Sequence, residues 1–101
     1  MKIAFEIKQN TLVAYPEGEL DECSAPTLRD SLDRKFKSAQ FGSFVMNMSR
    51  VSFMDSTGIG VLLGRYKLLR AVNIPFYIEQ PSPTVDKILR MSGLYQVITK
   101  I

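Results

Sequence analysis

A polar, glycine-rich turn at residues 54–60 holds the side chains best suited to chemistry in this sequence. It reads Met54-Asp55-Ser56-Thr57-Gly58-Ile59-Gly60 and opens an expected helix. Asp, Ser and Thr all cap helix N-termini by accepting hydrogen bonds from free backbone N–H groups, so capping alone accounts for them. A hydroxyl at this position also suits phosphorylation, because the helix dipole and free N–H groups stabilise an added phosphate. Both interpretations stay open on these residues alone.

The glycines of this stretch raise a second possibility, a nucleotide-binding turn. Gly58-x-Gly60-x-x-x-Gly64 follows an apolar run and opens a helical segment, and Glu79 comes where a ribose-binding acid could lie. The spacing departs from the G-x-G-x-x-G fingerprint because position 63 is Leu. A dinucleotide fold also normally needs a longer chain. Nucleotide binding is therefore kept as an alternative.

The composition excludes several enzyme classes. The chain has no histidine, so it can build neither a Ser-His-Asp nor a Cys-His arrangement, and it offers no histidine metal ligand. Asp21 and Asp55 are candidates for a carboxylate pair, and Glu22 could join them at a metal, but their spacing favours neither site. The thiol of Cys23 has no histidine to activate it. The sequence predicts a binding protein without cofactor or metal, not an enzyme.

Alternating strand and helix patterns predict an α/β fold. Period-two alternation is typical of strands, and apolar residues three and four apart are typical of helices. The expected strands are residues 3–8, 11–15, 43–48, 74–79 and 95–101, and the expected helices are 24–38, 56–72 and 82–92. The order ββαβαβαβ indicates a mixed sheet of about five strands with three helices, in which an antiparallel hairpin adjoins parallel pairs. The prediction is one domain over residues 1–101.

Local signals refine the expected boundaries. Pro16 should end its strand or confine it to a sheet edge, because proline donates no ladder hydrogen bond. Ser24 and Ser82 are expected N-caps, and Gly93 is an expected C-cap. The second helix has two apolar stripes, so it needs a further surface to cover, whether sheet, helix or partner. The second of these stripes consists of Val61, Leu68 and Val72.

The charge of the whole chain gives no sign of nucleic-acid binding. The net charge is +3, and the basic residues are scattered, apart from Arg65, Lys67 and Arg70 on one expected helix. The sequence contains no apolar run long enough to cross a membrane, and its start lacks a signal-peptide pattern. A single cysteine excludes an internal disulfide. We expect a cytoplasmic protein that binds neither nucleic acid nor membrane directly.

The segment from Ser52 to Lys67 resembles the STAS domain of anti-sigma factor antagonists. It reads Ser52-Phe53-Met54-Asp55-Ser56-Thr57-Gly58-Ile59-Gly60-Val61-Leu62-Leu63-Gly64-Arg65-Tyr66-Lys67. The resemblance extends to Gly18-Glu19-Leu20-Asp21, Ser24-Ala25-Pro26-Thr27-Leu28-Arg29, Val45-Met46-Asn47-Met48, Pro81-Ser82-Pro83-Thr84-Val85 and Met91-Ser92-Gly93-Leu94. It covers nearly the whole chain. The sporulation-type antagonists are closely similar, and the stress-response type is nearly as similar.

The resemblance implies a phosphorylation switch on a STAS fold. In this family the unphosphorylated antagonist binds an anti-sigma factor, which is also a serine protein kinase, and the sigma factor is released. The kinase uses ATP to phosphorylate the serine directly after the aspartate, which is Ser56 in this sequence. A PP2C-type phosphatase removes the phosphate and resets the switch.

A single surface is expected to contact the kinase. It combines the loop after the second strand, the serine turn and the exposed side of the following helix, where small glycines would let a partner come close. The expected partner-binding residues are Asp21, Asp55, Ser56, Thr57, Gly58, Gly60, Gly64 and Arg65.

Two points within the resemblance stay open. Family members usually carry a further helix after the last strand, whereas this chain stops at Lys100-Ile101, so we expect Tyr95, Val97 or Ile98 to be more exposed than usual. A STAS module with a scaffold or transporter-associated role is the alternative within the same fold.

Overall fold

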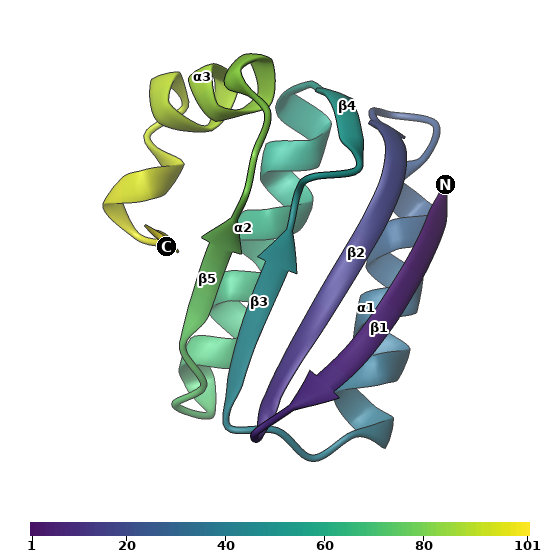
Figure 1. Cartoon of the computed structure of the whole chain (residues 1–101), viewed down its shortest axis with the longest axis vertical. Coiled ribbons are helices and arrows are strands. Elements are labelled where there is room, and N and C mark those ends of the chain that lie inside the picture. Colours follow the sequence, from purple (N-terminus) through teal and green to yellow (C-terminus); the bar gives the residue numbers. More distant parts are fainter.

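Strands and helices alternate along the chain and form a six-stranded sheet with α1 and α2 on one face (Figure 1). The computed structural model describes residues 1–101. The strands are β1 (Lys2–Lys8), β2 (Thr11–Leu20), β3 (Ser43–Asn47), β4 (Val51–Met54), β5 (Phe76–Glu79) and β6 (Thr99–Lys100). The helices are α1 (Ala25–Ser38), α2 (Ser56–Ala71) and α3 (Pro83–Met91), followed by the 3-10 turn η1 (Leu94–Gln96). The predicted mixed α/β fold with three helices is confirmed.

Strand β2 pairs with three other strands and organises the sheet. The strand order is β1-β2-β3-β5-β6, and β4 pairs with the C-terminal end of β2. The β1–β2 hairpin is antiparallel and the other pairs are parallel. Because β2, β4 and β5 lead directly into α1, α2 and α3, the N-termini of all three helices follow the carboxyl ends of strands.

The hydrophobic core fills the space between the sheet and its helices. Phe44 is fully buried in this core, with edge-to-face contacts to Phe36 at 5.0 Å and Phe76 at 4.9 Å between ring centroids. Other fully buried core side chains include Leu12, Leu28, Leu32, Met46, Leu62, Ile78 and Leu89. Burying each such side chain stabilises the fold by about 1.5–3 kcal/mol.

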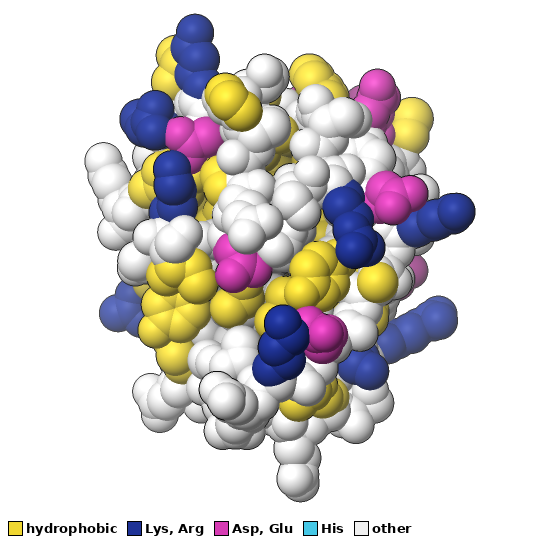
Figure 2. All heavy atoms as spheres, viewed as in Figure 1, with side chains coloured by type: hydrophobic (Ala, Val, Ile, Leu, Met, Phe, Trp, Pro, Cys, Tyr) yellow, Lys and Arg dark blue, Asp and Glu magenta, His cyan; other side chains and the backbone are white.

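The opposite face of the sheet carries no helix and mixes apolar with charged side chains (Figures 1 and 2). Here the Tyr15 hydroxyl donates a hydrogen bond to Glu6, and the Arg50 guanidinium lies 5.0 Å from the Tyr15 ring centroid. The hydrogen bond from Tyr15 is the main reason why the pKa of Glu6 is lowered. Polar and cation–π contacts thus cover part of the apolar surface on this side.

The expectation for Pro16 was wrong. Strand β2 is internal and continues through a buried Pro16 to Leu20. Its parallel pairing with β3 ends at Ala14, and its pairing with β4 begins at Gly18, where the register shifts and φ is +114°. A proline fits because β2 has no parallel partner in that gap, and a glycine fits because it tolerates positive φ.

Strand boundaries differ most after the centre of the chain. Residues 51–54 form strand β4, which the sequence pattern did not predict because the run is short and precedes a polar turn. The expected strand over 95–101 is reduced to β6, and residues 94–96 form η1 instead. Of the residues expected to be exposed there, Val97 is exposed, but Ile98 is fully buried.

The helix caps follow the sequence signals with one exception. The Ser82 side chain accepts a hydrogen bond from the Val85 N–H, and Gly93 adopts a left-handed φ of +82° just after α3. Ser24 occupies the N-cap position of α1, but its hydroxyl donates to the Glu19 carbonyl instead of capping the helix.

Candidate functional site

The side chain of Asp55 caps the N-terminus of α2. Its Oδ1 atom accepts hydrogen bonds from the N–H groups of Thr57 at 2.9 Å and Gly58 at 3.2 Å. The side chains of Ser56 and Thr57 take no part in this cap, and both residues are exposed. The carboxylate therefore satisfies the first turn of the helix and leaves the Ser56 hydroxyl on the surface at the helix N-terminus.

The Asp21 loop and the Ser56 turn lie side by side. Leu20 is in register with Met54, and the Asp55 N–H donates to the Leu20 carbonyl at 3.2 Å. In the loop itself, Asp21 Oδ1 accepts hydrogen bonds from the N–H groups of Cys23 and Ser24, both at 3.0 Å. These bonds, that from Ser24 foremost, lower the pKa of Asp21 and keep it ionised. The surface therefore carries two carboxylates in hydrogen-bonded turns.

The three glycines of α2 have different environments. Gly58 is buried, and a Cβ there would lie 2.8 Å from Leu20 Cγ and 3.0 Å from Met54 Cγ. Packing against these side chains accounts for Gly58 without any nucleotide phosphate. A Cβ at Gly60 or Gly64 would meet no atom within 4 Å. Internal packing therefore does not require glycine at either of these positions.

The structure corrects the placement of Arg65. Arg65 was expected on the exposed side of α2, but only 9% of it is exposed. Its Nε atom lies 3.1 Å from Asp33 Oδ1, so the pair joins α2 to α1. The helical pattern alone did not reveal this role, because a polar residue between two apolar stripes looks solvent-facing until the neighbouring helix is placed.

Phe53 is an exposed aromatic residue near the serine turn and was not among the predicted residues. It lies on β4 directly before the serine turn, and 43% of it is exposed. An exposed aromatic beside polar loops is a common feature of protein interfaces. The signal available in the sequence was its position next to the turn, but without β4 its orientation could not be inferred.

Two further properties bear on the chemistry available. No group of three or more His, Cys, Asp or Glu side chains is placed to hold a metal ion. None of the helices is long and apolar enough to span a membrane. What the geometry offers at this end of α2 is an exposed Ser56 hydroxyl beside the capped helix N-terminus.

Comparison with known proteins gives the family. The model of the STAS domain family matches residues 2–101. An anti-sigma F factor antagonist from Paenibacillus polymyxa is 32% identical over 98 residues, covering 97% of this chain and 84% of that protein. An anti-sigma-B factor antagonist from Bacillus subtilis (strain 168) is 31% identical over 100 residues, covering 97% of this chain and 90% of that protein.

Solved structures of anti-sigma factor antagonists are also similar to this chain. The anti-sigma factor antagonist SpoIIAA in its unphosphorylated form is 32% identical, with a TM-score of 0.81 over 99% of this chain and 88% of that chain. The phosphorylated form of Bacillus SpoIIAA is 31% identical, with a TM-score of 0.72 over 99% of this chain and 91% of that chain. With a family match over almost its whole length and relatives above 30% identity, this chain belongs to the STAS domain family.

Proposed function

We propose that this protein is an anti-sigma factor antagonist that is switched off by phosphorylation of Ser56. In this proposal the unmodified protein binds an anti-sigma factor serine kinase in the cytoplasm, and the sigma factor is released. The kinase then transfers phosphate from ATP to Ser56, and a PP2C-type phosphatase removes it. The names of relatives at 31–32% identity support the antagonist function, and a solved phosphorylated form of one relative supports the switch.

The exposed Ser56 hydroxyl beside the Asp55 cap is the observation that carries the proposal. A kinase can reach this hydroxyl without unfolding α2, because Asp55 and not Ser56 satisfies the helix N-terminus. Thr57 is also exposed, so accessibility alone does not choose between the two hydroxyls. The choice of Ser56 follows the family pattern, in which the modified serine comes directly after the aspartate.

Electrostatics explains how one phosphate would abolish binding. A phosphoserine carries about −1.5 to −2 charges at neutral pH. The Thr57 and Gly58 N–H groups already bind Asp55, so the phosphate would lie beside a carboxylate, with the helix dipole as its main compensation. The free protein can leave this charge in water. A docked partner would have to bury it unpaired, which costs several kcal/mol.

The proposed kinase-binding surface is centred on this turn. It includes Asp21, Ser56 and Thr57, together with the open side of α2 at Gly60 and Gly64. Asp55 belongs to this surface because it caps the helix that carries Ser56. Gly58 is buried beneath the surface, where it packs against Leu20 and Met54. Phe53 is added as an apolar contact, and Arg65 is removed because it is buried.

The direct test is to mix the protein with ATP and the anti-sigma factor kinase of its own organism. We expect mass spectrometry to find one phosphate on Ser56, and calorimetry to find a Kd at least a hundredfold higher for the phosphorylated form, equivalent to about 2.7 kcal/mol. Ser56→Ala should bind and resist modification, whereas Ser56→Asp should bind poorly. Thr57→Ala is the matched control and should still be phosphorylated. Phosphate on Thr57, or equal affinity of both forms, contradicts the proposal.

A further inference from the structure

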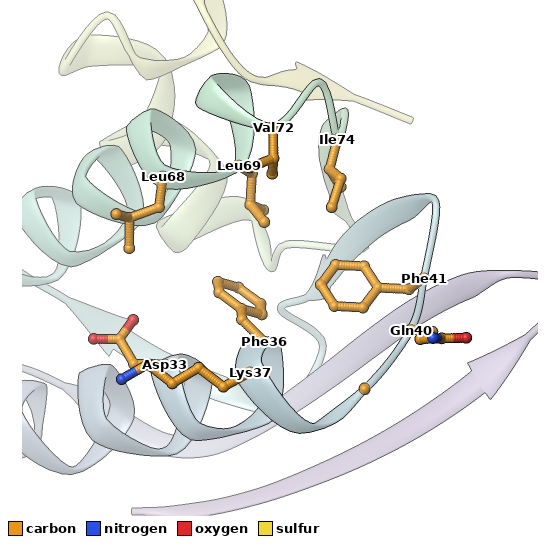
Figure 3. A pocket seen from close by; sticks show the side chains of 10 residues that line it. Asp33, Phe36, Lys37, Gln40, Phe41, Leu68, Leu69, Val72 and Ile74 are labelled. Atoms are coloured by element: carbon orange, nitrogen blue, oxygen red, sulfur yellow. The ribbon is translucent and has the colours of Figure 1, made fainter.

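A groove separates the C-terminal halves of α1 and α2, far from the serine turn. Its cavity volume is about 560 Å³. Figure 3 shows Phe36 and Phe41 on one side facing Leu68, Leu69 and Val72 on the other. Grooves of this size with mainly apolar walls are typical of binding sites for amphipathic helices or small ligands.

The α2 wall of the groove is unusually exposed for apolar residues. Leu68 is 50% exposed and Val72 is 62% exposed. They belong to the second apolar stripe of α2, whose remaining member, Val61, is buried. The fold therefore covers one end of that stripe and leaves the other end open beside an apolar groove, which is a feature of interaction sites.

The α1 wall places Lys37 in the lining of the groove, and Arg29 lies beyond the groove toward the start of α1. Arg29, Asp33 and Lys37 are spaced four residues apart and so share one face of α1. Asp33 of this row pairs with Arg65 of α2, so the row faces α2 and its one carboxylate is neutralised. Arg29 and Lys37 form no ion pair within the chain. A segment complementary to the groove would carry acidic residues beside its apolar ones.

The groove is continuous with the surface around Ser56. Ser56, Gly60, Gly64, Leu68 and Val72 form a ridge with a spacing of four, which winds around α2 by about 40° per step from the serine turn to the groove. Leu68 lies about 18 Å along the helix from Ser56, at 1.5 Å per residue. One side of a standard interface buries about 800 Å², a patch roughly 30 Å across. A single partner can therefore cover both the turn and the groove.

We propose that the groove receives an acidic amphipathic helix of the anti-sigma factor, as a second anchor beside the contact at Ser56. This inference rests on the proposed function and names where the same partner also binds. Leu68 and Val72 supply the apolar contact, and Lys37 and Arg29 pair with the acidic side chains. The second anchor lies outside the immediate reach of a phosphate on Ser56, so it contributes to binding in both states of the switch.

The test uses two groove variants and one matched control. Lys37→Glu and Leu68→Gln change the rim and the apolar wall, and Arg34→Glu makes the same charge reversal on α1 outside the row that faces α2. We expect each groove variant to raise the Kd for the anti-sigma factor about tenfold, and the control to leave it within twofold. The effect of Lys37→Glu should shrink in high salt, whereas that of Leu68→Gln should not.

The outcomes separate this inference from the proposed function. Circular dichroism melting first establishes that each variant is folded, and Lys37→Gln serves in place of Lys37→Glu if the reversal destabilises α1. Wild-type affinity in both groove variants, with normal binding and phosphorylation of the wild-type protein, overturns the groove and leaves the proposed function intact. If the groove variants bind the anti-sigma factor normally but are no longer dephosphorylated, the inference is also overturned, because the groove then binds the phosphatase. Failure of the wild-type protein itself to bind overturns the proposed function.

Discussion

Gly60 and Gly64 interrupt a helix that would be more stable with alanine at both positions. Glycine inside a helix costs about 0.5–1 kcal/mol relative to alanine, because its unfolded backbone is freer. Open space surrounds both positions within this chain, so no internal contact offsets that cost. Gly58 differs because a side chain there would collide with Leu20 and Met54. The two outer glycines are therefore expected to serve a contact with another molecule.

Alanine substitution separates stability from binding at these positions. Gly60→Ala and Gly64→Ala should each raise the free energy of unfolding by about 0.5–1 kcal/mol in urea titrations. They should also weaken binding to the anti-sigma factor kinase, because a methyl group would hold the partner away from α2. Gly58→Ala is the contrasting case and should destabilise the fold by about 1–3 kcal/mol through overpacking. Unchanged affinity in both stabilised variants would remove the outer glycines from the interface.

At the scale of elements, the ion pair of Arg65 and Asp33 holds α1 and α2 together. Arg65 is nearly buried, while Asp33 keeps about a third of its side chain exposed. The buried Nε and Nη1 atoms of Arg65 and Oδ1 of Asp33 have no hydrogen-bond partner within the chain, so the two residues interact as an ionic contact without an aligned hydrogen bond. Removing Asp33 would leave a buried charge unpaired, which is more damaging than losing an exposed pair.

Arg65→Ala should therefore lower the free energy of unfolding by about 1–3 kcal/mol. In a chain of this size each kcal/mol corresponds to about 4 °C in melting temperature. Asp33→Ala should also destabilise, and the double variant should lose less than the sum of the two, because the residues form one unit. Additive losses, or an Arg65→Ala variant that melts with the wild type, would mean that the pair contributes no coupling.

A second polar cluster fixes the C-terminal segment to α3. Asp86 Oδ1 accepts hydrogen bonds from the Tyr95 hydroxyl at 2.6 Å and from Lys100 Nζ at 3.0 Å, and its other oxygen pairs with Arg90. The Tyr95 bond is the largest cause of the lowered pKa of Asp86, followed by that of Lys100. Burial and the bond to Asp86 together raise the pKa of Tyr95.

The pKa of Asp86 gives this segment a defined pH dependence. A carboxylate with a lowered folded-state pKa stabilises the protein above its unfolded pKa of about 3.9, and the effect disappears as pH falls through the folded-state value. Acidification below about pH 4 should therefore destabilise the wild type more steeply than Asp86→Asn. Urea titrations across that range measure the difference, and Asp30→Asn, on the exposed side of α1, provides the control. Parallel curves for Asp86→Asn and the wild type would contradict the assignment.

The elements also reveal what the sequence can and cannot predict. Apolar stripes and the capping residues of the serine turn located α2 and its start near Ser56, and cap chemistry located both ends of α3. The prediction for Pro16 was wrong because proline is expected at the edge of a sheet or at the end of a strand. The sequence does not reveal that β2 changes partner from β3 to β4 around Pro16, which leaves room for a proline inside the strand. Arg65 misled because its burial depends on where α1 lies, which is a tertiary property. Among the candidate site residues, adjacency of the Asp21 and Ser56 loops was predictable from parallel topology, whereas the orientation of Phe53 was not.

At the scale of the whole molecule, the residues that form the core are distinct from the residues of the proposed binding surface. One face of the sheet and the inner sides of α1 and α2 form the core. The N-terminus of α2, the adjoining Asp21 loop and the outer side of α2 lie outside this core, and the proposed function assigns recognition to them. Ser56 lies on the surface outside the core, so we expect the same core to support both states of the proposed switch.

Strand β2 pairs with three other strands, and this pairing holds the loops of the proposed switch in place. The loops that present Asp21 and Asp55 both leave from this part of the sheet, and a backbone bond from Asp55 to Leu20 links them. Strands secured on both sides open only when much of the domain unfolds. In the proposed switch, these loops keep their positions, and phosphorylation of Ser56 changes the charge of the surface and not its shape.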